Sequence, residues 1–199
     1  MNRSALSDLS FLSSQQIKTD DESLKIYGKD WTTYFDIKAS AVLFPKKTED
    51  VVGIVQWARK NKIALIPSGG RTGLSGAACA LQGEVIVSFE LMNQIKNFNQ
   101  VNQTVTCEAG VITENLQKWA AAHQLYYPVD FSARGSSHIG GNIATNAGGI
   151  KVLRYGLTRD WIAGLKVVTG RGDALELNNS LVKNATGYDL RHLFIGSEG

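Results

Sequence analysis

The chain has 199 residues, of which 43% are hydrophobic and 20% are charged. This composition is typical of a globular protein and excludes a disordered chain. The net charge of +3 is too small to indicate nucleic-acid binding. No apolar run approaches the roughly 18 residues of a membrane-spanning helix. The two cysteines, Cys79 and Cys107, lie far apart in the sequence. We expect both to be reduced in a cytoplasmic protein.

The first half of the chain shows a strand–helix–strand pattern after an N-terminal lead-in. The first 40 residues have no clear periodicity and are expected to be a helical lead-in, with the domain itself beginning near residue 36. Ala41–Phe44 is predicted as a short strand, and Thr48 is expected to cap the helix that follows. One face of that helix is apolar, at Val51, Ile54, Val55 and Ala58. Lys62–Ile66 and Glu84–Phe89 are predicted as buried strands. This order favours parallel pairing.

The second half repeats this mixture of strands and helices. Val101–Ala109 alternates apolar and polar residues and is predicted as a strand. Thr113 is expected to cap a helix whose shared face holds Leu116, Trp119, Ala120 and His123. Gly164–Thr169 and Ala174–Leu177 are predicted as two strands around a turn.

A polar stretch at residues 95–103 suggests a boundary between two small α/β lobes. The first lobe would span about residues 36–98 and the second about residues 99–199. The fold class expected from these elements is therefore α+β, built as two lobes.

Two loops hold much of the chain's glycine. Pro67–Gly76 is dense in small residues and has Arg71 as its only charge. Consecutive backbone N–H groups in such a loop can form a nest for an anion. The loop lacks the Gly-Lys-Ser/Thr ending of a P-loop and the G-x-G-x-x-G of a dinucleotide fingerprint. Phosphate binding and a plain turn are therefore equally compatible with this loop alone.

The second glycine loop, Gly135–Gly149, contains no charged residue. Its hydrogen-bonding side chains are Ser136, Ser137, Asn142, Thr145 and Asn146. Neutral donors on a rigid loop can bind a diphosphate or a polar heterocycle. Asp130 lies just upstream, where the residues alone favour a surface carboxylate or a helix cap over a ligand contact. The basic residues nearby, Arg134, Lys151 and Arg154, are expected to be solvated loop charges.

Three motifs in sequence order carry a resemblance to a known family. They are PSGGRTGLSGA at Pro67–Ala77, PVDFSARGSSHIGGNIATNAGGIKVLRYG at Pro128–Gly156, and NATGYDLRHLFIGSEG at Asn184–Gly199. Over about residues 30–199, the chain resembles the FAD-binding domain of the vanillyl-alcohol-oxidase-type (PCMH-type) flavoproteins. Within them it resembles the D-2-hydroxyacid dehydrogenases, which include D-lactate dehydrogenase, D-2-hydroxyglutarate dehydrogenase and the glycolate oxidase flavoprotein subunit. The resemblance implies two α/β lobes with FAD between them.

The resemblance also implies which residues contact FAD. The first loop would wrap the pyrophosphate, the second loop would line the flavin and its ribityl chain, and the GSEG ending would lead to the adenosine part. The implied residues are Pro67, Ser68, Gly69, Gly70, Arg71, Thr72, Gly73, Leu74, Pro128, Asp130, Ser136, Ser137, Ile139, Gly140, Gly141, Asn142, Ala144, Thr145, Asn146, Gly196 and Glu198.

The chain departs from many relatives at the position of covalent attachment. Those relatives link FAD through a histidine in or near the first loop, where this chain has Arg71 and Thr72. We therefore expect non-covalent FAD. The histidines His123, His138 and His192 are scattered, so no metal site is expected here. Some relatives use a divalent metal through residues of a substrate domain.

The implied function is that of a flavin-dependent oxidoreductase acting on a D-2-hydroxy acid of the lactate, glycolate or 2-hydroxyglutarate type. Hydride would pass from the substrate α-carbon to flavin N5, and electrons would then pass to a carrier protein or a quinone. In the family a C-terminal substrate domain follows GSEG and supplies the base, so the chain looks like a fragment without a catalytic acid or base of its own. Two alternatives are another flavoenzyme of this fold, of the aldonolactone oxidase or enolpyruvyl-sugar reductase type, and a non-catalytic nucleotide-binding module.

Overall fold

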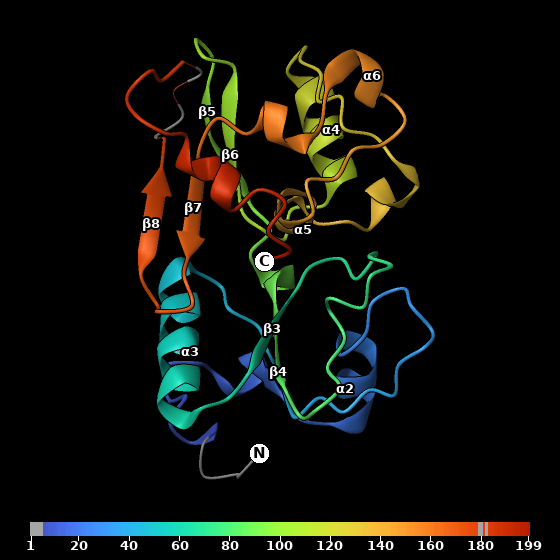
Figure 1. Cartoon of the computed structure of the whole chain (residues 1–199), viewed down its shortest axis with the longest axis vertical. Coiled ribbons are helices and arrows are strands. Elements are labelled where there is room, and N and C mark those ends of the chain that lie inside the picture. The colour runs from blue at the N-terminus through green and yellow to red at the C-terminus, as the bar shows by residue number, and fades with distance from the viewer. Residues whose placement is uncertain (1–5, 179–180, 182) are drawn as a thin grey trace. The chain divides into compact units, whose positions relative to one another are not determined.

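The computed structural model describes residues 6–178, 181 and 183–199 (Figure 1). Its contacts divide the chain into two compact units. The N-terminal unit comprises the residues up to Met92 together with Val168–Ala174. The C-terminal unit comprises Asn93–Val167 and Leu175–Gly199.

The N-terminal unit is built on a four-stranded sheet. Its strand order is β1-β2-β4-β3, where β2 and β3 both pair with β4 in parallel and β1 pairs with β2 antiparallel. The parallel pairing expected from the strand–helix–strand pattern is confirmed. The strands are β1 (Ile17–Lys18), β2 (Ala41–Leu43), β3 (Leu65–Ser68) and β4 (Val85–Ser88).

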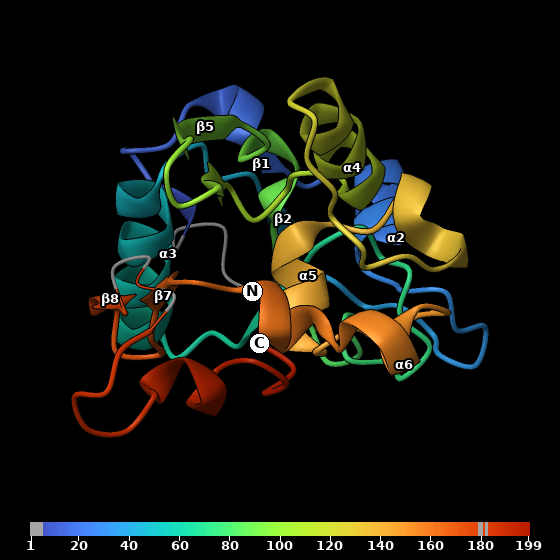
Figure 2. The same cartoon turned by 90° about the horizontal axis from the view of Figure 1, so that it is seen from above.

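Helices cover both faces of this sheet, which explains why its central strands β2 and β4 are almost entirely apolar. Helix α3 (Thr48–Asn61) packs through Ile54, Trp57 and Ala58 on the face formed by Ala41, Leu43, Val85 and Val87. Helix α2 (Asp21–Tyr27) lies on the other side, against Val42, Phe44, Ala80 and Ile86 (Figures 1 and 2). Successive residues of a strand point to opposite faces, so β2, β3 and β4 each supply both cores.

Two expectations for this unit need correction. Within the described residues, the lead-in is helical at Leu6, in the short 3₁₀ turn Ser14–Gln16 and in α2, but residues 29–40 form no regular element. Thr48 is the first helical residue of α3, while Lys47 is the cap. Lys47 keeps an extended backbone, with φ −152° and ψ 165°, so the helix begins one residue earlier than a Thr48 cap would require.

The C-terminal unit combines short helices with a hairpin. The hairpin pairs β5 (Ile95–Asn99) with β6 (Thr104–Cys107). The helices are α4 (Thr113–Ala122), α5 (Ile139–Ala144) and α6 (Val152–Tyr155), with 3₁₀ turns at Ser132–Gly135, Thr158–Trp161 and Leu190–Leu193. Val111, Leu116 and Ile139 form the buried centre.

A second hairpin joins β7 (Leu165–Val168) and β8 (Ala174–Leu177), as the sequence predicts. Its turn belongs to the N-terminal unit, where Arg59 Nη1 of α3 donates to Arg171 O at 2.7 Å. Within the described residues, no helix is long and apolar enough to cross a membrane.

Three differences from the sequence expectations concern β5, β6 and α4. The polar stretch that suggested a boundary contains β5, and only Thr104–Cys107 of the predicted Val101–Ala109 strand is a strand. Ile112, not Thr113, caps α4. Leu116 and Ala120 are buried as expected, but His123 is exposed and its ring stacks on Trp119 at 4.0 Å between centroids.

Candidate functional site

The first glycine loop leaves the carboxyl end of β3, an end of parallel strands where α/β proteins commonly bind ligands. No backbone N–H from Gly69 to Ser75 donates to an acceptor in the described part of the chain. Arg71 adopts a left-handed conformation, with φ 56°. Its guanidinium lies 4.5 Å from the centre of the Tyr27 ring. A run of unpaired N–H groups around a left-handed residue suits an anionic ligand.

Two buried hydroxyls lie at the base of this loop. Ser68 and Ser88 are register partners at the ends of β3 and β4, and each has an exposed fraction of 0%. Neither Oγ has a hydrogen-bond partner among the described residues. Unpaired buried hydroxyls are costly, so both are available to a polar ligand. Sequence reasoning missed Ser88, whose only signal was one hydroxyl at the end of an otherwise apolar strand.

The second glycine loop contains α5, whose adjacent glycines differ in their surroundings. A Cβ on Gly140 would lie 2.7 Å from Ala109 Cβ and 3.0 Å from Ala109 O. This close approach lets the N–H of Gly140 donate to Ala109 O at 2.8 Å. A Cβ on Gly141 would meet no described atom within 4 Å. Gly140 is therefore needed for packing, whereas Gly141 presents an open backbone.

Four of the predicted polar side chains of this loop, Ser137, Asn142, Thr145 and Asn146, form hydrogen bonds within the protein. Thr113 Oγ1 lies 2.7 Å from Ser137 Oγ and accepts from Asn142 Nδ2 at 2.6 Å, all buried. Thr145 Oγ1 donates to Gly141 O at 3.0 Å, and Asn146 Oδ1 accepts from the N–H of Arg159 at 3.0 Å. These contacts fix the shape of the loop.

Asp130 is neither a surface carboxylate nor a helix cap, which corrects the preference drawn from its residues alone. It is 7% exposed and forms ion pairs with Arg134 Nη1 at 2.8 Å and Lys151 Nζ at 2.9 Å. Hydrogen bonds from Arg134 and Lys151 lower the pKa of Asp130 below its usual 3.8. Arg134 and Lys151 are thus not merely solvated loop charges, because both converge on one carboxylate.

The end of the second glycine loop contacts the backbone carbonyl of Asp130. The N–H of Ile150 donates to Asp130 O at 3.0 Å. A Cβ on Gly149, where φ is 113°, would lie 2.1 Å from that oxygen. Only glycine therefore fits at this position.

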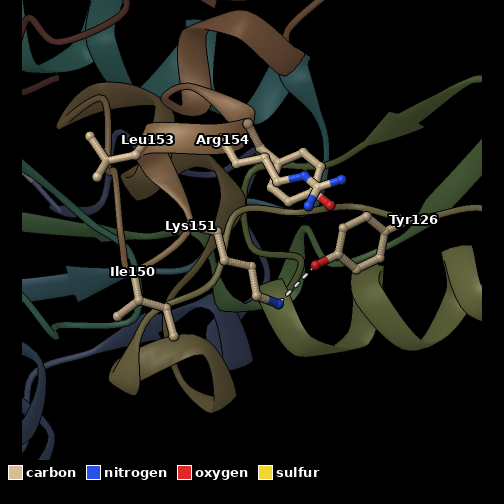
Figure 3. A pocket seen from close by; sticks show the side chains of 6 residues that line it. Tyr126, Ile150, Lys151, Leu153 and Arg154 are labelled. Carbon is tan, nitrogen blue, oxygen red and sulfur yellow. Dashed lines mark hydrogen bonds between the residues drawn. The ribbon is translucent and has the colours of Figure 1, made fainter.

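A pocket of about 350 Å³ adjoins this ion-pair cluster in the C-terminal unit (Figure 3). Lys151 points toward Tyr126 and donates to its hydroxyl at 2.8 Å. The guanidinium of Arg154 lies 5.3 Å from the centre of the Tyr155 ring. The remaining lining residues are Ile150 and Leu153. Because Lys151 is also ion-paired with Asp130, Arg154 is the cation of this pocket that has no carboxylate partner among the described residues.

The GSEG ending reaches the carboxyl end of α5. The N–H of Gly196 donates to Ile143 O at 3.0 Å, and the N–H of Glu198 donates to Ala144 O at 2.8 Å. The structure thus brings Gly196 and Glu198 together with the second loop. Pro128 is fully buried and Ser136 is exposed. The predicted residues 67–74 lie in the N-terminal unit, and the other predicted residues lie in the C-terminal unit.

Both cysteines are free thiols. Burial raises the pKa of Cys107 to about 11, so this side chain is protonated at neutral pH. Among the described side chains, no three of the His, Cys, Asp or Glu type are grouped to hold a metal ion.

Comparison with known proteins assigns the family. Residues 39–178 match the family model described as "FAD binding domain". The chain is 62% identical over 184 residues to D-2-hydroxyglutarate dehydrogenase of Stutzerimonas stutzeri, covering 92% of this chain and 40% of that protein. It is 41% identical to the mitochondrial D-2-hydroxyglutarate dehydrogenase of Arabidopsis thaliana, and the match covers 94% of this chain and 34% of that protein. The chain thus spans about two fifths or less of the length of these relatives.

Solved structures show the same fold. An alkyldihydroxyacetonephosphate synthase matches with a TM-score of 0.88 and 22% identity, covering 100% of this chain and 38% of that one. The 4-ethylphenol oxidase of Gulosibacter chungangensis matches with a TM-score of 0.80 and 23% identity, and the match covers 96% of this chain and 39% of that one. These likenesses confirm the expected mixed α/β architecture.

The local geometry fits the FAD cofactor that this family binds. The unpaired N–H groups after Ser68 suit a diphosphate, the two orphaned hydroxyls suit a polar ligand, and Gly141 leaves its backbone open. The chain belongs to the FAD binding domain family, and FAD is its cofactor.

Proposed function

We propose that this chain is the FAD-binding part of a flavin-dependent dehydrogenase that oxidises D-2-hydroxyglutarate. The observation that carries the proposal is its identity of 62%, 54% and 41% to three proteins named D-2-hydroxyglutarate dehydrogenase. The fold alone does not select this substrate, because structures of the same fold include a synthase and a phenol oxidase. Free cysteines support the accompanying proposal of a cytoplasmic location.

We assign the cofactor contacts to the two glycine loops and the GSEG ending. The N–H groups from Gly69 to Ser75 would bind the pyrophosphate. The open backbone at Gly141, with Asp130 upstream, would line the flavin and ribityl chain, and the ending at Gly196 would lead to the adenosine part. Bound FAD supplies the acceptor for the hydride from the substrate α-carbon.

We assign no catalytic acid or base to these residues. The proposal places the base and the substrate-binding residues in a C-terminal substrate domain outside this sequence. It makes a carrier protein or a quinone the electron acceptor. Within this chain, Arg134 and Lys151 hold Asp130 in place, and the unpaired amides orient the cofactor.

We further propose that FAD is held without a covalent bond. The first loop offers Arg71 and Thr72 where many relatives place a linking histidine. Acid precipitation of the flavin-loaded protein should release all of the yellow colour into the supernatant. Flavin fluorescence that stays on the protein band of a denaturing gel would contradict the proposal.

The substrate assignment is tested on the natural gene product that carries these residues, purified with its flavin. D-2-hydroxyglutarate, L-2-hydroxyglutarate, D-lactate and glycolate are each supplied with a dye acceptor. We expect the highest kcat/KM with D-2-hydroxyglutarate. A higher value with another acid would overturn the substrate assignment, and no reduction by any of the four would overturn the dehydrogenase assignment.

A further inference from the structure

Asp30 lies outside the glycine loops and before the residues that match the family model, yet it is tied to the first loop. Its side chain is 6% exposed. Oδ2 accepts from the N–H of Gly76 at 2.8 Å. Oδ1 accepts from the N–H of Thr32 at 2.8 Å, from its hydroxyl at 2.7 Å, and from the Cys79 thiol at 3.4 Å. One carboxylate therefore joins the loop end to an irregular segment.

The residues next to Asp30 hold the same loop. The N–H of Trp31 donates to Gly73 O at 3.0 Å, and the N–H of Ala80 donates to Gly28 O at 2.8 Å. Gly76 has φ 78°, a conformation that glycine adopts readily. Trp31 thus contacts the loop in its carboxyl-terminal half, next to the amides that have no acceptor among the described residues, and the Gly28–Ala80 bond holds the segment just after the loop.

The carboxylate is ionised at neutral pH. Burial by itself raises the pKa of Asp30, but the hydrogen bonds from Thr32, Cys79 and Gly76 outweigh it and bring the pKa below 3.8. A negative charge close to a loop that binds a diphosphate opposes that binding electrostatically. Any help that Asp30 gives to diphosphate binding therefore comes from the shape it imposes on the loop and not from its charge.

We propose that Asp30 is a positioning residue for the cofactor, holding the first glycine loop in the conformation that accepts the diphosphate of FAD. The inference rests on the assignment of that loop to the diphosphate. An ordered loop loses less conformational entropy when the ligand binds, so the affinity rises without any new contact to the ligand.

The acceptor geometry explains why the side chain is a carboxylate. The N–H groups of Gly76 and Thr32 can only donate, and they meet different oxygens of Asp30. An asparagine offers one acceptor oxygen and one donor NH₂ group. In Asp30→Asn, one of the two backbone donors must therefore face another donor.

The test is a fluorescence titration of FAD into the chain and its variants. Asp50→Asn is the matched control, because Asp50 is also 6% exposed and accepts from Lys46 N at 2.9 Å and Gln16 Nε2 at 3.1 Å. We expect Asp30→Asn to raise the Kd for FAD about tenfold, the equivalent of one lost hydrogen bond. Asp50→Asn should leave the Kd within about twofold.

Two outcomes of the titration would overturn the proposal. Unchanged or tighter binding by Asp30→Asn would show that charge outweighs positioning. Equal weakening by Asp50→Asn would show that only general destabilisation is being measured. Asp30→Glu keeps two acceptor oxygens, so it should bind FAD more tightly than Asp30→Asn, and the reverse order would also contradict positioning.

A second measurement needs no FAD. Cleavage by trypsin after Arg71, the basic residue inside the loop, should be faster in Asp30→Asn than in the parent chain and in Asp50→Asn, because a less ordered loop is cut more readily. An unchanged cleavage rate would contradict the proposal. If the variants differ in this way but the parent chain does not bind FAD, the cofactor assignment of the loop fails while the role of Asp30 in ordering it stands.

Discussion

Asp130 illustrates how a single buried carboxylate can order a loop. Its oxygens meet Arg134 and Lys151, and Lys151 also donates to Tyr126. Because both cations are partly exposed, solvent and salt reduce the strength of these pairs. The cluster therefore contributes more to the position of the residues around Asp130 than to the total stability.

The lowered pKa of Asp130 makes its contribution depend on pH. Hydrogen bonds from Arg134 and Lys151 hold that pKa below 3.8, so the folded state binds the proton more weakly than the unfolded state does. The stabilisation is present above the unfolded pKa and is lost as the pH falls through the folded value. Urea unfolding should show Asp130→Asn to be less stable than the parent at pH 7, with a difference that shrinks below about pH 4. A difference that stays constant down to pH 2 would contradict the ion-pair account.

Gly141 allows the ligand contact to be separated from folding. A Cβ at this position meets no described atom within 4 Å. Alanine in a helix is favoured over glycine by about 0.5–1 kcal/mol, so Gly141→Ala should keep or raise the melting temperature of the chain without flavin. The same variant should weaken FAD binding, because the added methyl occupies space assigned to the cofactor. Gly170→Ala is the control at an equally open turn position, and should leave FAD affinity unchanged. Full FAD affinity in Gly141→Ala would show that this loop is only a turn.

At the scale of elements, α4 and α5 are joined by a buried hydroxyl. Thr113 Oγ1 contacts Ser137 and Asn142, and Thr113→Val removes that group while keeping the shape. The variant leaves buried polar partners unsatisfied, which costs about 1–3 kcal/mol. Urea denaturation should show this loss for Thr113→Val and a much smaller one for Thr145→Val, whose hydroxyl is exposed and bonds to its own helix. Equal losses for both variants would argue against the α4–α5 connection.

The elements that sequence reasoning predicted are those with a strong local pattern. β2 and β4 are buried on both faces and are therefore apolar, apart from Ser88 at the end of β4. β5 was missed because its residues are mostly exposed, so its sequence resembles a loop. The Thr48 and Thr113 caps failed because a hydroxyl near a helix start does not reveal which residue keeps an extended backbone.

At the scale of the whole molecule, sequence motifs found the glycine loops but not the contacts that support them. Asp30 lies in a segment without periodicity, and only its contacts with Gly76 and Thr32 reveal a role. Asp130 and Lys151 are 21 positions apart in the sequence, so their ion pair could not be inferred from spacing. The turn between β7 and β8 joins the N-terminal unit through contacts that are distant in sequence.

The central claim, that this chain binds FAD through diphosphate contacts in its first glycine loop, is tested most directly by comparing FAD with FMN. FMN carries the flavin and ribityl phosphate but lacks the second phosphate and the adenosine. Parallel fluorescence titrations should give a lower Kd for FAD than for FMN. Equal or tighter binding of FMN would mean that the diphosphate contacts contribute nothing, and would contradict the account.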